Sequence, residues 1–234
     1  MRIDVLTIFP EMFAPVLGAS MLKRGQQRGR LRISVHDLRD YTKDKHRKVD
    51  DRPYGGGPGM VMRPEPIVKA VNAMKRVCRH RSARTCQTIL MSPQGNTFSQ
   101  AHAARLAKVA HLIVICGHYE GVDERVRLAV VDQMISIGDY VLTGGELPAM
   151  VVIDSVARLI PGVIGHAQAT KDESFVAGYL EYPHYTRPQV FNGLEVPEVL
   201  RSGDHERVAQ WRRAAAMERT RTMRPDLIRA NGKE

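Results

Sequence analysis

The sequence has few cysteines, no long hydrophobic run and fewer acidic than basic side chains. Its three cysteines, Cys78, Cys86 and Cys116, lie in separate segments without Cys-X-X-Cys spacing. This spacing argues against a disulfide framework and against a cysteine zinc site. No segment reaches the roughly 18 uninterrupted apolar residues that a membrane span requires, and the apolar N-terminal run contains Asp4. We therefore expect a cytoplasmic protein with reduced thiols, no membrane partner and no cleaved leader.

The shortage of acidic residues leaves a strongly basic chain. Lys and Arg number 35 against 25 Asp and Glu, which gives a formal net charge of +10. Such an excess favours a phosphate-rich partner, although an ordinary basic protein would share it. The 234 residues, 43% of them hydrophobic, can bury a core in one large domain, or in one domain and a smaller second one.

Short β-branched segments alternate with segments of helical spacing in the first half of the chain. We expect strands at 2–9, 31–36, 86–91 and 111–116, and helices at 64–77 and 99–109. This alternation predicts an α/β fold with a mostly parallel sheet. The unbroken apolar run at 112–116 predicts a strand that is covered on both faces, and ligands of open α/β sheets bind where such strands end.

The second half of the chain predicts mainly helices. One helix should run from Gly145 to about Arg158 and end before Pro161-Gly162, after which a linker extends to about residue 174. Another should span 204–221 as part of a small basic helical domain. In that helix we expect Val208, Trp211 and Ala215 to face inward, with Arg207, Arg212, Arg213 and Arg219 around them.

A glycine-rich segment, Asp51-Arg-Pro-Tyr-Gly-Gly-Gly-Pro-Gly-Met60, cannot be helical. Its glycines permit close approach to a ligand. Cations at 43–48 just before it could hold phosphates, but a solvated charged loop followed by a glycine turn would have the same sequence. Because no Gly-Lys-Ser or Gly-Lys-Thr follows, the phosphate loop of nucleotide hydrolases is excluded.

Three further segments carry polar groups in places that suit a ligand. Backbone groups of the glycine-flanked segment 137–148 could bind an adenine edge or a ribose, or the segment is simply a turn between strand and helix. In segment 117–125, Asp123 and Glu124 also fit a helix N-terminus, which leaves Glu120 as the functional candidate. The segment Tyr182-Pro-His-Tyr-Thr-Arg-Pro188 could stack on nucleic acid, or be an ordinary surface loop. We interpret His166 and His184 as structural residues, because no spacing suggests a metal site.

Five blocks, in order along nearly the whole chain, resemble the bacterial tRNA (guanine-N1)-methyltransferases of the knotted SPOUT-type superfamily. The resemblance implies a trefoil-knotted α/β domain at 1–160, a linker at 161–175 and a helical tRNA-binding domain at 176–234. It also implies a homodimer with shared active sites, tRNA rather than DNA as the partner, and S-adenosylmethionine as the methyl donor. The blocks are Val49–Met60, Ser92–Gly95, Tyr119–Arg125, Ser136–Pro148 and Pro183–Pro188.

The resemblance also implies which residues form the site. Glu120 is implicated in a possible Mg²⁺ requirement. We assign substrate binding to His46, Asp50, Arg52, Gly55, Gly59 and Arg187. The cofactor pocket is expected to comprise Met91, Ser92, Pro93, Gly117, Tyr119, Glu120, Ile137, Gly138, Tyr140, Leu142, Gly144, Gly145 and Pro148.

The catalytic pair implied by the resemblance is an arginine and a carboxylate. The arginine falls on Arg158. The family's general base is an aspartate directly before a Ser-Phe pair, but here that position holds Glu173, with Asp172 one residue earlier. Either acid could act as the base, and a misplacement near 1 Å can cost around a hundredfold in rate.

Two other functions stay open at this level. A tRNA- or rRNA-binding protein without catalysis would explain the charge and the aromatic segment, but not the glycine block at 138–145. A knotted methyltransferase acting on ribose 2′-hydroxyls or on rRNA would use the same cofactor, but would need no base aimed at guanine N1.

Overall fold

The computed structural model describes residues 1–79, 86–165 and 173–230. The chain separates into two compact units, 1–166 and 167–234, with the division inside the expected linker. Over the described residues, no helix is long and apolar enough to cross a membrane.

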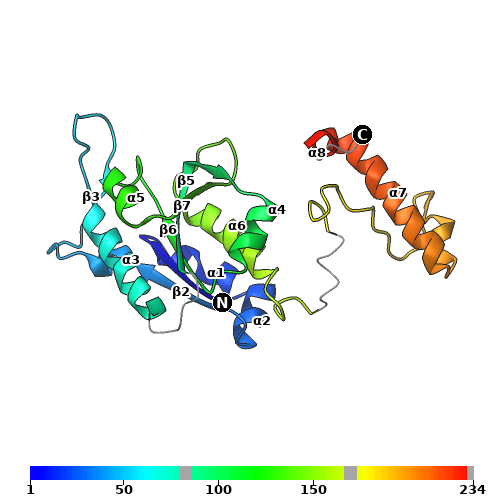
Figure 1. Ribbon diagram of the computed structural model, residues 1–234, viewed down its shortest axis with the longest axis horizontal. Helices are drawn as coiled ribbons and strands as arrows, with labels where there is room; N and C mark the ends of the chain where they lie inside the picture. The colour runs from blue at the N-terminus through cyan, green and yellow to red at the C-terminus, as the bar shows by residue number, and fades with distance from the viewer. Residues whose placement is uncertain (80–85, 166–172, 231–234) are drawn as a thin grey trace. The chain divides into compact units, whose positions relative to one another are not determined.

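The first unit is built on a five-stranded sheet in the order β2-β1-β6-β5-β7 (Figure 1). Every pairing in this sheet is parallel, as the sequence predicts. All six residues of β6, the central strand, are buried, which confirms the prediction drawn from its apolar run. The strands are β1 (Arg2–Thr7), β2 (Arg32–Asp37), β5 (Cys86–Thr97), β6 (His111–Cys116) and β7 (Gln133–Ser136).

Helices cover both faces of the sheet, and each face has its own apolar core. One core joins the sheet to α2, α4 and α6. The other joins it to α3 and α5. The helices of this unit are α1 (Ala14–Leu17), α2 (Ser20–Gln27), α3 (Pro64–Arg79), α4 (Gln100–Leu106), α5 (Glu124–Val130) and α6 (Glu146–Ala157), with 3-10 turns at Pro10–Met12 and Leu38–Tyr41.

The predicted α/β class is confirmed, and the main differences concern strands. Strand β5 continues six residues beyond the predicted end at residue 91, with a register shift between Met91 and Asn96 where it pairs with β7. Strand β7 was not predicted. A small hairpin, β3 (Asp50–Asp51) with β4 (Val61–Met62), was also missed. The knot implied by the resemblance concerns how the chain threads, which strand order does not define, and stays a prediction.

The second unit consists mainly of α7 (His205–Met223) and α8 (Pro225–Ala230), with a short hairpin of β8 (Val190–Phe191) and β9 (Leu194–Glu195) and a 3-10 turn at Glu198–Arg201. Helix α7 begins where the sequence predicts, because the side chain of Asp204 accepts hydrogen bonds from the amides of Glu206 and Arg207 at 3.1 Å each. The expected inward residues of α7 are half-buried, whereas its fully buried positions are Ala216 and Thr220.

Candidate active site

A cavity of about 340 Å³ lies where β6 and β7 end and where β5 shifts register. Its volume is typical of a small-molecule site, and its position is the one expected for ligands of an open parallel sheet. Every residue predicted for the cofactor pocket lines this cavity. Those residues are Met91, Ser92, Pro93, Gly117, Tyr119, Glu120, Ile137, Gly138, Tyr140, Leu142, Gly144, Gly145 and Pro148.

The loop between β7 and α6 closes one side of the cavity by packing directly against the end of β6. The amide of Gly145 donates to the carbonyl oxygen of Gly117 at 2.7 Å, and His118 forms an antiparallel bridge with Gly144. A Cβ at position 145 would lie 2.9 Å from Cα of Cys116. The segment is therefore more than a turn between strand and helix: its glycines let two backbones meet at the cavity wall.

The turn after β6 forms another wall and is held by β4. Tyr119 has a φ of +60°, unusual for a residue other than glycine. The amide of Glu120 donates to the carbonyl oxygen of Met60 at 3.0 Å, and that of Met62 donates to the carbonyl oxygen of Gly121 at 2.9 Å. Burial first, and then the charge of Asp50, raises the pKa of Tyr119 above its ordinary value.

The glycine-rich segment is the loop of the β3–β4 hairpin, and it adjoins the cavity. Asp50 begins this hairpin, and Tyr54 at its loop is fully exposed. A Cβ at Gly59 would overlap the carboxylate of Glu120, so the loop approaches the cavity as closely as glycine allows. Of the predicted substrate-binding residues in this part of the chain, Gly59 therefore adjoins the cavity wall, and Asp50 lies in the same hairpin.

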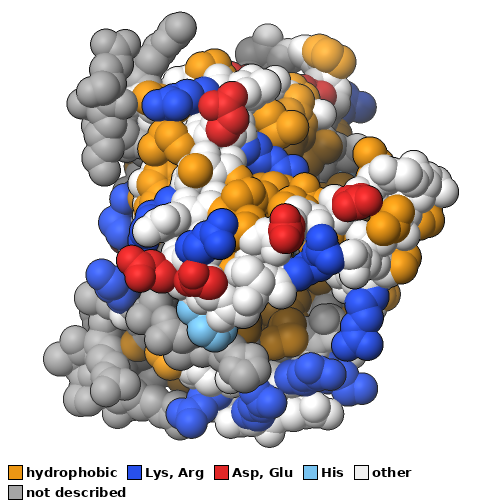
Figure 2. Space-filling model, turned by 90° about the vertical axis from the view of Figure 1, so that its right-hand side faces the viewer, with side chains coloured by type: hydrophobic (Ala, Val, Ile, Leu, Met, Phe, Trp, Pro, Cys, Tyr) orange, Lys and Arg blue, Asp and Glu red, His pale blue; other side chains and the backbone are white. Residues whose placement is uncertain are grey.

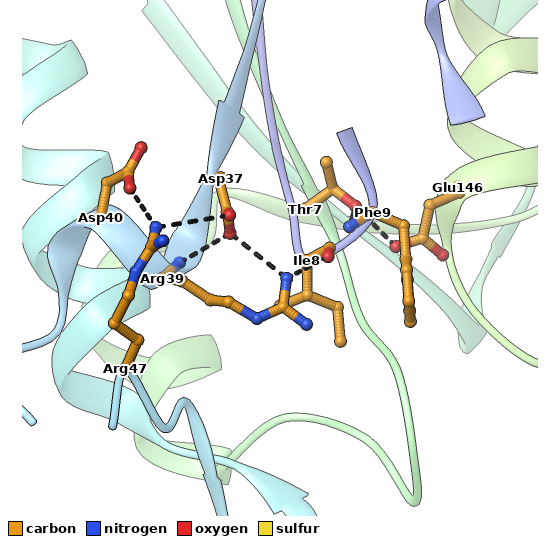
Figure 3. A network of polar contacts seen from close by, with 8 residues as sticks. All are labelled: Thr7, Ile8, Phe9, Asp37, Arg39, Asp40, Arg47 and Glu146. Atoms are coloured by element: carbon orange, nitrogen blue, oxygen red, sulfur yellow. Dashed lines mark hydrogen bonds and ion pairs between the residues drawn. The ribbon is translucent and has the colours of Figure 1, made fainter. Parts of the chain in front are cut away.

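The basic stretch before this hairpin is folded rather than extended. Asp44 accepts hydrogen bonds from the amides of His46 and Lys48, at 2.8 and 3.2 Å. Arg47 forms ion pairs with Asp37 and Asp40 (Figure 3), so part of its charge is already compensated. The cations at 43–48 are exposed, and those other than Arg47 are better placed to meet a phosphate.

Two of the acidic residues near the cavity have arginine partners. Asp123 caps α5 through the amide of Arg125 and also binds the Arg125 side chain, which confirms the helix-terminus interpretation. Glu124 pairs with Arg127 at 2.6 Å. Within the described ranges, no three His, Cys, Asp or Glu side chains gather to hold a metal ion. Glu120, the residue that the resemblance links to Mg²⁺, lines the cavity.

Arg158 lies away from the cavity of its own chain. It is the C-cap of the 12-residue helix α6, so about 18 Å of helix, at roughly 1.5 Å per residue, separates it from the cavity end. Arg158 is exposed, on the same side of α6 as Leu147 and Val151, which are 53% and 45% exposed. The structure therefore places this predicted catalytic arginine on a partly apolar outer face of the helix.

Glu173 lies in the second unit, in a turn that is anchored to α7. Beside it, Phe175 has a φ of +73° and lies under the guanidinium of Arg224 at 5.7 Å. The amide of Leu180 donates to the hydroxyl of Thr220 at 2.9 Å. These contacts give the carboxylate-bearing turn a defined shape within its unit. Asp172, His166 and Lys171 lie outside the described residues.

The aromatic and basic segment 182–188 also packs on α7. The guanidinium of Arg212 lies 4.7 Å from the ring centre of Tyr182, and the Tyr185 and Trp211 rings are 6.3 Å apart. Arg187, the remaining predicted substrate residue, is exposed in this segment. The face drawn in Figure 2 carries Lys and Arg side chains among hydrophobic and acidic ones. The pairing of arginine with aromatic rings in this segment suits nucleic acid, which offers both charge and stacking.

Sequence reasoning missed a buried polar network behind the cavity. The hydroxyl of Thr7 donates to Oε1 of Glu146 at 2.7 Å, as Figure 3 shows, and accepts from the amide of Phe9 at 2.9 Å. The second carboxylate oxygen, Oε2, lies 3.8 Å from Nδ1 of His118, which lines the cavity. An acidic residue directly after the double glycine was the available signal, but first-turn acids are usually explained by the helix dipole.

Comparison with known proteins gives a consistent result. Residues 1–230 match the family described as tRNA (Guanine-1)-methyltransferase TrmD. Among curated proteins, the tRNA (guanine-N(1)-)-methyltransferase of Moorella thermoacetica is 59% identical over 228 residues, 97% of this chain and 90% of the relative. The proteins of the same name from Pelotomaculum thermopropionicum and Dictyoglomus turgidum are each 54% identical, over 99% and 97% of this chain and 91% and 90% of their own lengths.

Proposed function

Since the chain belongs to the tRNA (guanine-1)-methyltransferase family, we propose that it transfers a methyl group from S-adenosylmethionine to N1 of the guanine next to the anticodon on its 3′ side, position 37 of tRNA. The resemblance seen in the sequence blocks is confirmed. The observation that carries the proposal is the cavity, which gathers every residue predicted to hold the methyl donor.

The cavity residues fit S-adenosylmethionine by shape and by chemistry. Backbone groups of the 137–145 loop and of the turn at Gly117 would bind the adenine and ribose, and Met91 and Leu142 offer apolar contact. Glu120 places a carboxylate where a cationic ligand would be favoured. When bound, S-adenosylmethionine supplies an electrophilic methyl group on a sulfonium, and the chain aligns guanine N1 with it and excludes water.

The chemistry also needs a base, because N1 of guanine carries a proton at neutral pH. Glu173, or Asp172, is the carboxylate that would take this proton as the methyl group arrives. Loss of the proton moves negative charge onto O6 of the base. The guanidinium of Arg158 would stabilise that charge in the transition state more than in the ground state.

The target base must leave its stack to expose N1, and the β3–β4 loop is the segment beside the cavity that could receive it. Gly55 and Gly59 permit close approach, while Asp50 and Arg52 offer polar contacts. Arg187, together with His46 and the lysines beside it, would then hold phosphates. The second unit, with Arg212 over Tyr182, would hold the anticodon stem.

We place Arg158 in the cavity of a partner subunit rather than in its own. The length of α6 separates it from the cavity of its chain, and exposed Leu147 and Val151 on the same side give α6 an apolar face suited to a second copy. This placement supports the proposal of a homodimer with shared active sites. The knot, the cytoplasmic location, the lack of a DNA partner and a Mg²⁺ requirement stay predictions.

One assay tests the proposed reaction. The purified protein should methylate a tRNA transcript that has guanine at position 37 and should leave the matched transcript with adenine there unmodified. Mass spectrometry of the digested product should identify 1-methylguanosine. Methylation of a ribose hydroxyl, or equal labelling of both transcripts, would exclude the proposed reaction, and binding of tRNA without any S-adenosylmethionine uptake would favour a non-catalytic RNA-binding protein.

A further inference from the structure

Glu146 is a buried carboxylate at a place where acidic residues are normally exposed. It is the first residue of α6, yet its side chain is only 2% exposed and turns inward from the helix end. Burying a carboxylate costs free energy unless hydrogen bonds or a charged partner compensate it. A hydrophobic residue would fill this space at lower cost, so the carboxylate needs an explanation in its contacts.

Only one of the two carboxylate oxygens has a close hydrogen bond in the part of the chain that the structure describes. Thr7 donates to Oε1 at 2.7 Å, and because Thr7 accepts from the amide of Phe9, its single proton is free to point at Glu146 (Figure 3). The other oxygen, Oε2, is 3.8 Å from Nδ1 of His118, too far for a hydrogen bond.

His118 is the complementary half of this arrangement. Among the described residues, its Nδ1 is buried and has no hydrogen-bond partner. Its ring lies between Phe9, 4.9 Å away, and Tyr119, 5.0 Å away in an edge-on contact. His118 and Tyr119 both line the cavity, so an adjustment of this ring changes the cavity wall directly.

The loop between β7 and α6 runs directly over the space between the side chains of Glu146 and His118. A Cβ at Gly144 would overlap both the carboxylate of Glu146 and Nδ1 of His118. Glycine at this position therefore leaves room for the carboxylate and the imidazole to face each other. The distance of 3.8 Å between Oε2 of Glu146 and Nδ1 of His118 needs to shorten by only about 0.8 Å to reach an ordinary hydrogen bond near 3.0 Å.

From these contacts we infer that Glu146 is a positioning residue of the cofactor site, which acts through His118. Its carboxylate, fixed by Thr7, accepts a hydrogen bond from Nδ1–H of His118 when S-adenosylmethionine fills the cavity, and this bond holds the His118–Tyr119 wall against the ligand. The inference rests on the proposed function, since it takes the methyl donor as the occupant. The bond satisfies two buried groups at once, so it favours the filled state.

The test compares Glu146→Gln with wild type in the full-length protein. The amide keeps the size of the side chain but removes the charge that attracts the imidazole. We expect the Kd for S-adenosylmethionine, measured by calorimetry, to rise at least about tenfold. The KM for S-adenosylmethionine should rise in parallel, while kcat and the KM for tRNA should change less than about threefold. Glu65→Gln, at an exposed first-turn glutamate of α3, is the matched control and should bind normally.

A second pair of variants covers the case in which Glu146→Gln fails to fold. Thr7→Val keeps the shape of the side chain and removes the donor that fixes the carboxylate, whereas Thr7→Ser keeps the donor. We expect weakened cofactor binding for Thr7→Val and nearly normal binding for Thr7→Ser. In nitrogen NMR, the Nδ1 signal of His118 can be identified because it is lost in His118→Asn. Addition of S-adenosylmethionine should shift this signal in wild type but not in Thr7→Val.

The outcomes separate this inference from the proposed function. If wild type binds S-adenosylmethionine and methylates tRNA while Glu146→Gln and Thr7→Val bind it equally well, the positioning role is wrong and the proposed function stands. Lower thermal stability with unchanged Kd and KM would mean a purely structural carboxylate and would also overturn the inference. If wild type does not bind S-adenosylmethionine, both proposals fail together.

Discussion

The amide of Gly145 donates a 2.7 Å hydrogen bond to the carbonyl oxygen of Gly117, and this bond ties the start of α6 to the end of β6. The approach is possible because Gly145 has no side chain, since a Cβ there would lie 2.9 Å from Cα of Cys116. The cavity wall therefore depends on two backbones that meet directly.

Gly145→Ala should disrupt this wall. The new Cβ would lie 2.9 Å from Cα of Cys116 and 3.0 Å from the amide nitrogen of Gly117, and backbone atoms yield less readily than a side-chain end. We expect a loss of about 1–3 kcal/mol in the free energy of unfolding, measured in urea, and weaker S-adenosylmethionine binding. Gly165→Ala, where a Cβ meets nothing within 4 Å, is the control. Equal stability of the two variants would contradict the close-packing argument.

Arg158→Ala and Glu173→Gln should each abolish methyl transfer while S-adenosylmethionine binding stays nearly normal. Neither residue lines the cavity, and removal of a general base or of an oxyanion partner commonly costs a hundredfold or more in rate. Single-turnover assays with tRNA, beside calorimetry with S-adenosylmethionine alone, would measure the two effects.

Asp172→Asn decides which acid is the base. If Glu173 is the general base, Asp172→Asn should keep most of the methyl-transfer activity. Glu173→Asp should lose part of it, because its shorter side chain must reach the same proton on guanine N1. Normal turnover by Arg158→Ala and Glu173→Gln would show that neither residue has a role in catalysis.

Four of the five strands of the main sheet were predictable because their signals are local, whereas the members of the cofactor site were implied by the resemblance of the sequence blocks. The apolar run at 112–116 identifies a covered strand, and the glycine blocks follow strand ends, where ligands gather. Strand β7 was not predicted because it is only four residues long and forms by pairing with β5 on both sides of a register shift. A 3.6-residue or two-residue period cannot be recognised over so short a segment.

The network behind the cavity could not be predicted, because it depends on tertiary distance. Thr7 and Glu146 are 139 positions apart, and only the parallel sheet brings the end of β1 to the start of α6. Locally, an acid in the first turn of a helix predicts an exposed side chain. By contrast, the position of Arg158 at the far end of α6 from the cavity agrees with the predicted helix from Gly145 to about Arg158.

Asp4 makes the first unit sensitive to acid. Its carboxylate is fully buried and burial alone would raise its pKa, but hydrogen bonds from His111 at 2.6 Å, His36 at 2.8 Å and Arg2 at 2.5 Å lower the pKa far below its usual value. A lowered carboxyl pKa stabilises the fold above the ordinary value near pH 4, and this contribution is lost as the pH falls further.

Asp4→Asn should therefore destabilise the protein at pH 7, by about 3 kcal/mol, because three donors then face a neutral amide. Urea unfolding between pH 2 and pH 7 should show a shallower loss of stability below about pH 4 than wild type. Asp226→Asn, in an exposed pair with Arg224, is the comparison and should have little effect. An identical acid profile for Asp4→Asn and wild type would refute this role.

Arg212 should contribute to tRNA binding through both its charge and its contact with Tyr182, 4.7 Å from the ring centre. Arg212→Ala should weaken tRNA binding several-fold and lower the slope of log K against log salt by about 1. S-Adenosylmethionine binding should not change. Arg212→Lys keeps the charge but not the planar guanidinium, so it should restore the salt slope without restoring full affinity. Unchanged tRNA binding by Arg212→Ala would exclude this part of α7 from the interface.

Mixing two inactive variants tests whether Arg158 serves the cavity of a partner subunit. Gly117→Val should fold, since a Cβ there meets Val122 at 3.6 Å and Met91 at 3.8 Å, but its side chain occupies space between two residues that line the cavity and should block the methyl donor. A mixed dimer with Arg158→Ala would pair an intact cavity from one subunit with an intact arginine from the other.

Activity should therefore reappear when the two variants are refolded together. With random pairing, about half of the dimers are mixed and each has one complete site, so recovery should approach a quarter of the wild-type rate, by the symmetry of a two-fold dimer. Each variant refolded alone is the control and should stay inactive. If the mixture is as inactive as its components while size-exclusion chromatography shows mixed dimers, Arg158 must act within its own chain, and the length of α6 would have to be bridged by a rearrangement of that chain.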